Sequence, residues 1–128
     1  MPRLTVWALR LALVWWGVGL LLGALILARE ALGWPALAAA IPAHAEMVLV
    51  GWMIQFALGV AYWILPRVGV NVDHPPAYVV SAFVLLNAGV GCVLAGSLAA
   101  GRSLELLALV AFAIHAIPRV RGTVLTDT

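Results

Sequence analysis

Residues 11–28, LALVWWGVGLLLGALILA, are all apolar or glycine and lie between the charged side chains of Arg10 and Arg29. The hydrocarbon core of a bilayer is about 30 Å thick, and roughly 20 apolar residues in a helix cross it. Arg10 can extend its guanidinium to the interface while its aliphatic part stays among apolar groups. The stretch therefore predicts a membrane-spanning helix over residues 6–28.

The composition of the whole chain extends this prediction to the fold. Of the 128 residues, 66% are hydrophobic and 9% are charged, which excludes an ordinary soluble domain. The length leaves room for about four spans and for no separate soluble catalytic domain. We predict an all-α integral membrane protein with a single membrane domain, residues 1–128. Its four transmembrane helices are expected to form an antiparallel bundle at residues 6–28, 43–65, 77–100 and 104–117.

Proline and glycine set the predicted boundaries of these helices. Pro42 is expected to begin the second helix and Pro118 to end the fourth, because proline fits the first turn of a helix and breaks its interior. The residues Gly101-Arg102-Ser103 are expected to form the turn between the third and fourth helices. Residues 29–42 are expected to form a connecting loop with a short interfacial turn, and residues 68–76 a second loop.

The basic residues predict the orientation in the membrane. All seven are arginine, and only Arg29 and Arg102 fall on the same side of the predicted spans as the first loop. The positive-inside rule then places both termini in the cytoplasm, with the protein in the cell's inner membrane. The arginines form no cluster that could neutralise several phosphates, so a nucleic-acid partner is not expected.

The second predicted helix carries a polar face. At about 100° per residue, four of its residues fall on one face and Gly59 lies close to it. The four residues are His44, Gly51, Gln55 and Tyr62. Because buried polar groups need partners, this face is expected to point into the bundle.

Two interpretations fit this polar face. In the first, Gln55 and Tyr62 hold the helix to its neighbours while the small residues allow close packing, and Asn87 of the third helix bonds to Gln55 with a contribution of about 1 kcal/mol. In the second, the glycines leave space for a flat cofactor whose metal His44 coordinates, since neutral imidazole is a usual ligand of haem iron.

Residues 44–67, HAEMVLVGWMIQFALGVAYWILPR, resemble the second transmembrane helix of the catalytic subunit in the haem-copper oxidase superfamily. The most similar members are the cbb3-type cytochrome c oxidases, the nitric oxide reductases and the NnrS-type membrane proteins. The resemblance covers roughly a fifth of the chain, and its matching elements are His44, Gly51-Trp52, Gly59, Tyr62 and Pro66-Arg67. In that family the histidine that opens this helix is an axial ligand of the low-spin haem b near the outer face. The distribution of arginines independently places His44 at the outer end.

The resemblance implies a b-type haem on His44, in a site that would include Gly51, Gln55, Gly59 and Tyr62. The family's catalytic subunits have many more spans, a second axial histidine and further histidines for a second metal. Apart from His44, this chain has only His74 and His115.

His115 is expected near the cytoplasmic end of the fourth helix, about 25 Å in depth from His44. The two imidazoles cannot easily ligate one iron. His115 is therefore either a separate metal ligand or an interfacial side chain that bonds to a carbonyl. We do not expect a complete oxygen- or nitric-oxide-reducing centre, or the enzymatic activity that such a centre provides.

The acidic residues are expected at the membrane interface. Glu46 lies about 200° around its helix from His44, so it should point away from any ligand of His44. Arg102 and Glu105 flank the outer end of the fourth helix and are expected to pair locally. No mid-membrane charge or broken helix marks a solute pathway, which disfavours a channel or carrier.

Two functional hypotheses follow from the sequence. The first is a small respiratory membrane protein that binds haem b through His44, or an accessory subunit of an enzyme resembling a haem-copper oxidase or nitric oxide reductase. The second axial ligand would come from another copy or from a partner subunit. The alternative is a cofactor-free structural or assembly subunit of a membrane complex. Both hypotheses place the chain in the lipid bilayer, as a homo-oligomer or within a larger respiratory complex.

Overall fold

The computed structural model describes residues 2–65 and 77–124, and these residues form helices and no strand. Four of the helices are long and apolar enough to cross a bilayer, and they cover Arg3–Leu27, Pro35–Ile64, Ala77–Leu94 and Leu98–Val120. The prediction of an all-helical chain with four candidate membrane spans is therefore confirmed. The loop predicted at residues 68–76 lies outside the described residues.

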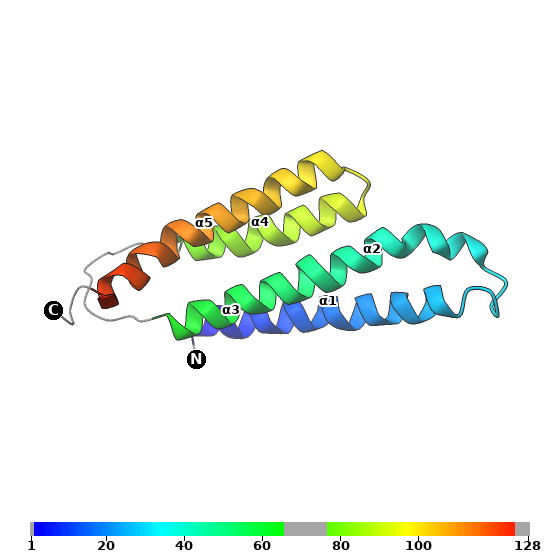
Figure 1. Cartoon of the computed structure of the whole chain (residues 1–128), viewed down its shortest axis with the longest axis horizontal. Helices are drawn as coiled ribbons and strands as arrows, with labels where there is room; N and C mark the ends of the chain where they lie inside the picture. The colour runs from blue at the N-terminus through cyan, green and yellow to red at the C-terminus, as the bar shows by residue number, and fades with distance from the viewer. Residues whose placement is uncertain (1, 66–76, 125–128) are drawn as a thin grey trace.

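The four long helices form two hairpins, which lie side by side (Figure 1). In the first hairpin, α1 (Arg3–Leu27) packs against a long helix of four consecutive segments. These segments are η1 (Pro35–Ala40), α2 (Ile41–Glu46), η2 (Met47–Ile54) and α3 (Gln55–Ile64). The second hairpin contains α4 (Ala77–Leu94) and α5 (Leu98–Val124). Both hairpin turns lie at one end of the bundle, and the start of α1 and the end of α5 lie at the other (Figure 1).

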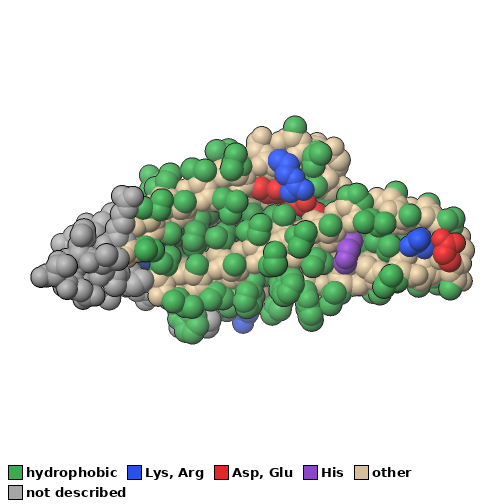
Figure 2. All heavy atoms as spheres, in the orientation of Figure 1, with side chains coloured by type: hydrophobic (Ala, Val, Ile, Leu, Met, Phe, Trp, Pro, Cys, Tyr) green, Lys and Arg blue, Asp and Glu red, His purple; other side chains and the backbone are tan. Residues whose placement is uncertain are grey.

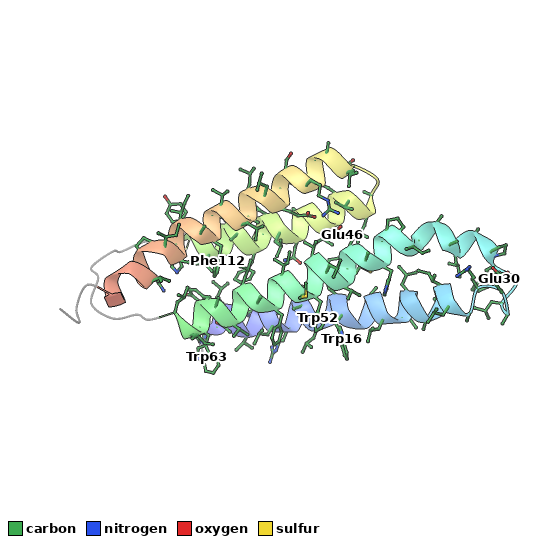
Figure 3. All side chains as sticks on the ribbon, viewed as in Figure 1. Trp16, Glu30, Glu46, Trp52, Trp63 and Phe112 are labelled. Atoms are coloured by element: carbon green, nitrogen blue, oxygen red, sulfur yellow. The ribbon has the colours of Figure 1, made fainter. Side chains whose placement is uncertain are left out.

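A small hydrophobic core lies between the hairpins. It contains Ala8 of α1, three residues of α4, and Phe112 of α5, which is labelled in Figure 3. The residues of α4 are Val79, Ala82 and Phe83. Many large apolar side chains outside this core are exposed, and green side chains cover much of the surface in Figure 2. An apolar exterior around a small, partly polar interior is the arrangement that lipid surroundings require.

The turn of the second hairpin is formed by Ala95–Ser97, and the prediction of a turn at Gly101–Ser103 is wrong. Gly96 has a φ of +87°, a conformation that L side chains rarely adopt. The amide of Ser97 donates to the carbonyl of Cys92 at 2.8 Å, which is the long bond of a Schellman motif. This motif ends α4 at Leu94, before the predicted end of the third helix at residue 100.

Gly101 lies inside α5, where it allows close contact with α4. A Cβ atom added to it would meet the carbonyl oxygen of Gly89 at 2.8 Å and the side chain of Val93. The sequence Gly-Arg-Ser was predicted to form a turn. In the structure, the absence of a side chain on Gly101 allows the two helices to pack closely. The fourth helix therefore begins at Leu98, before the predicted residue 104.

Two prolines were expected to begin or end a helix, but both lie inside longer helices. The second long helix begins at Pro35, and Pro42 lies in the first turn of α2, a position that proline tolerates. Residues 35–42 of the loop predicted at 29–42 are therefore helical. The helix α5 continues through Pro118 to Val124, so the prediction of a short fourth helix is wrong. Membrane helices tolerate internal proline because neighbouring groups satisfy the freed carbonyl.

The substitution Gly101→Ala tests the contact between α4 and α5. Its Cβ would force the two backbones apart, and we expect the free energy of unfolding in detergent to fall by about 1–3 kcal/mol. Gly91→Ala is the matched control, because a Cβ at this position of α4 has no atom within 4 Å. Equal stability of the two variants in a denaturant titration would contradict this packing.

Candidate functional site

The second long helix changes its helical period in the segment that contains the predicted site. Residues Met47–Ile54 form a π-helix between the α-helical segments α2 and α3. A π-helix bonds each amide to a carbonyl five residues earlier, so its side chains rotate less per residue than in an α-helix. Side chains that would share one face of a regular α-helix therefore point in different directions. No pattern in the amino-acid sequence indicates this change of period.

His44 is held against α1 by a bond to its backbone. Its Nδ1 lies 2.8 Å from the carbonyl oxygen of Gly19. A carbonyl oxygen only accepts, so Nδ1 carries the proton in this bond, and in the neutral imidazole Nε2 then has the lone pair. The imidazole covers Gly23, where a Cβ would meet its Cε1 at 2.7 Å. The Gly19–Gly23 pair thus gives the ring both a bonding partner and the space it occupies.

A groove beside His44 opens between α1 and α2. Its volume is about 490 Å³, and apart from His44 its lining residues are apolar or glycine. They are Leu20, Gly23, Ala24, Ile26, Leu27 and Ile41. No hydrogen-bond partner of Nε2 is found within the described ranges 2–65 and 77–124. A histidine side chain, drawn in purple, reaches the surface of the first hairpin in Figure 2.

Side chains of α1 fill the space beside the glycines that were predicted to accommodate a flat cofactor. A Cβ at Gly51 would meet Cγ of Trp15 at 2.7 Å, and one at Gly59 would meet Cβ of Ala8 at 3.3 Å. The interior between α1 and the second long helix therefore offers no slot beside these two residues. Their small size serves close packing of the first hairpin, as the first of the two sequence interpretations expected.

Gln55 is the centre of a polar network between the hairpins. It is fully buried, and its Nε2 donates to the carbonyl oxygen of Ala8 at 3.1 Å. Asn87 Nδ2 donates to Gln55 Oε1 at 2.8 Å, so the predicted bond between these two residues is confirmed. Trp15 Nε1 donates to Asn87 Oδ1 at 2.8 Å. The network joins α1, α3 and α4 through amides and an indole that would otherwise lie unpaired in an apolar interior.

Tyr62 faces the second hairpin, where it contacts His115. The two ring centroids lie 5.6 Å apart, and His115 is 1% exposed. Tyr62 and His44 are separated by about 25 Å along the second long helix. The structure therefore does not bring His44 and His115 together, in agreement with the depths predicted from the sequence.

Glu46 points away from the side of the helix that His44 occupies, as predicted, but it turns into the protein and is not exposed. Its side chain is 3% exposed, and Figure 3 places it between the two hairpins. Arg102 binds it through both nitrogens, with Nη2 to Oε2 at 2.6 Å and Nη1 to Oε1 at 3.2 Å. The predicted local pair is also present, with Arg102 Nη1 2.6 Å from Glu105 Oε2. Glu105 was expected at the interface as well, but its side chain is 9% exposed.

Comparisons with protein-family models, with curated proteins and with solved structures find no match for this chain. Within residues 2–65 and 77–124, no group of three or more His, Cys, Asp and Glu side chains could hold a metal ion. A functional assignment therefore depends on the arrangement of the polar residues around His44, Gln55 and Glu46.

The substitution Asn87→Leu tests the central network. It keeps the approximate side-chain volume but leaves Gln55 Oε1 and Trp15 Nε1 without this partner. We expect the free energy of unfolding in micelles to fall by about 1–2 kcal/mol. Ser81→Ala is the control, because the Ser81 hydroxyl is exposed and bonds only to the carbonyl of Tyr78 in the same helix. A loss no larger than that of the control would show that the network does not stabilise the fold.

Proposed function

We propose that this chain is a small respiratory membrane protein that binds a b-type haem through His44, as an accessory to an enzyme resembling a haem-copper oxidase or nitric oxide reductase. The proposal includes both termini in the cytoplasm and His44 toward the outer face of the inner membrane. It combines the resemblance of residues 44–67 to a haem-ligand helix with the geometry of His44.

The observation that carries the proposal is the hydrogen bond between His44 Nδ1 and the carbonyl of Gly19, at 2.8 Å. Metal-ligating histidines commonly donate the other ring N–H to a backbone carbonyl or carboxylate. That bond fixes the tautomer and the ring orientation, and it increases the basicity of the free nitrogen. Here it leaves Nε2 as the nitrogen that would bind iron.

The size and the apolar lining of the groove beside His44 suit an apolar, flat ligand. Its volume of about 490 Å³ lies within the range of about 300–1,000 Å³ that is common for ligand pockets. Haem also carries two propionates, and these need a cation. Arg29 follows α1 at this end, and its guanidinium donates to the carbonyl of Ile26, a residue that lines the groove. Haem would supply one-electron chemistry when bound, while this chain would supply the imidazole, the apolar walls and the cation.

Haem at this position would lie on the surface of the first hairpin, outside the interior that Gly51 and Gly59 line. A second axial histidine would come from another copy or from a partner subunit, because His115 lies about 25 Å away along the bundle. This is a binding and electron-transfer role, and the chain supplies no histidines for a second catalytic metal.

The alternative function is a cofactor-free structural or assembly subunit of a membrane complex. One observation favours it: Trp15 and Ala8 fill the space at Gly51 and Gly59, as expected for a helical scaffold. In that case the bond from His44 to Gly19 serves helix association alone. His44→Ala would then leave the partners of the chain and the activity of its host enzyme unchanged.

The optical spectrum of the detergent-purified protein, with haem b added, tests the proposal. We expect a Soret band and a pyridine haemochrome signal that His44→Ala removes, because the iron loses its ligand. Gly23→Ala should reduce the signal in part, since its Cβ would collide with the imidazole.

The matched control for the spectrum is His115→Gln, which removes the other described histidine and should keep the Soret band. A wild-type protein that shows no Soret band after haem addition would reject haem binding. A band of equal strength in His44→Ala would reject His44 as the ligand.

A further inference from the structure

A second groove opens between α1 and α4, where the two hairpins meet. Its volume is about 340 Å³. Leu4, Leu11 and Val14 are among its lining residues on α1, and their spacing places them along one face of that helix. Gln55 of α3, which is fully buried, and Asn87 of α4 lie at its base. The groove is therefore apolar along its length, with the central polar network beneath it.

The length of this groove matches one leaflet of a bilayer. Leu4 lies at the start of α1, at one end of the bundle, and Val14 lies deeper along the helix. The rise along α1 from Leu4 to Val14 is about 15 Å. Half of a hydrocarbon core that is about 30 Å thick is also about 15 Å. A single acyl chain that enters at the membrane interface would therefore run the length of the groove.

The amides at the base of the groove already bond within the protein. Asn87 Nδ2 donates to Gln55 Oε1 and to the carbonyl oxygen of Phe83, each at 2.8 Å, so both of its hydrogens are used. Asn87 Oδ1 accepts from Trp15, and Gln55 Nε2 donates to the carbonyl oxygen of Ala8. A hydrocarbon chain needs no polar partner at this depth, whereas a polar ligand would have to compete for these bonds.

The groove also carries positive charge. Arg10 lines it and is exposed, and its guanidinium carbon lies 5.8 Å from the centre of the Trp7 ring, toward the start of α1. Arg3 is exposed on the same face, because seven residues turn an α-helix by about 700°, close to two full turns. Neither arginine pairs with a carboxylate in the described segments 2–65 and 77–124. Two unbalanced cations beside an apolar groove are complementary to a negative group attached to hydrocarbon.

We propose that this groove binds an anionic phospholipid, with its phosphate at Arg10 and one acyl chain between α1 and α4. A guanidinium pairs with phosphate oxygens through two parallel N–H bonds, and Arg3 adds a second positive charge on the same face. Trp7 is 67% exposed and suits the interfacial region of the lipid. The acyl chain contacts both hairpins and holds them together. This site is separate from the groove beside His44, so it does not depend on haem binding.

Native mass spectrometry of the full chain in detergent tests the headgroup. The probes are phosphatidylglycerol, which is anionic, and phosphatidylcholine with the same acyl chains, which has no net charge. We expect phosphatidylglycerol to bind at the lower concentration. Arg10→Gln should raise its half-saturating concentration about fivefold, the effect of one arginine near anionic lipid. Arg119→Gln is the matched control, because Arg119 lies near the end of α5, at the same end of the bundle, and does not line the groove.

A larger side chain at the deep end of the groove tests the acyl chain. Val14→Trp should weaken phosphatidylglycerol binding, because the indole occupies the space of the chain. Val18→Trp is the control, since Val18 is exposed one turn further along α1 and does not line the groove. Circular dichroism should show the same helix content in both variants, and neither arginine variant should alter haem binding at His44.

Three outcomes would overturn the proposal. Equal binding of the two lipids, or equal effects of Arg10→Gln and Arg119→Gln, would exclude recognition of an anionic headgroup at Arg10. Equal effects of Val14→Trp and Val18→Trp would exclude an acyl chain in the groove. A dimer that persists in lipid-free detergent and that Val14→Trp dissociates would assign the groove to a second copy of this chain.

Discussion

Polar groups inside a bilayer need partners from the protein, because no water is available to them there. Two polar contacts and one contact between aromatic rings join the first hairpin to the second at successive levels of the second long helix. They are Glu46 with Arg102, Gln55 with Asn87, and Tyr62 with His115. Apolar packing alone would select one alignment of the hairpins weakly, because lipid chains are as apolar as leucine. The position of one hairpin against the other therefore depends on these polar contacts.

Glycines determine how closely the helices approach, and each of these close approaches places a polar, charged or aromatic side chain. Gly23 accepts the imidazole of His44, and Gly51 accepts the indole of Trp15, which in turn bonds to Asn87. Gly89 accepts the acidic side chain of Glu105. The first approach supports the proposed haem ligand. Small residues here do more than allow tight packing, because they decide which polar groups meet.

His44 and Glu46 lie two residues apart in sequence, yet their side chains lie in separate environments. His44 faces α1 and an apolar groove at the surface, whereas Glu46 points between the hairpins toward α5. Beyond them, the π-helical segment Met47–Ile54 turns Gln55 and Tyr62 toward the second hairpin. One helix thus supplies a candidate metal ligand on one side and a buried carboxyl group on the other.

The sequence alone predicted four helices long and apolar enough to cross a bilayer, because the thickness of the bilayer sets the length that an apolar helix needs. It also predicted the bond between Gln55 and Asn87, since each is a polar residue deep in an apolar helix and needs a partner. The local pair of Arg102 and Glu105 followed from their spacing. Only the tertiary structure decided which glycine forms the turn, where the helical period changes, and that Glu46 is buried. Each of these depends on atoms of a neighbouring helix, and the pattern of a single helix does not contain them.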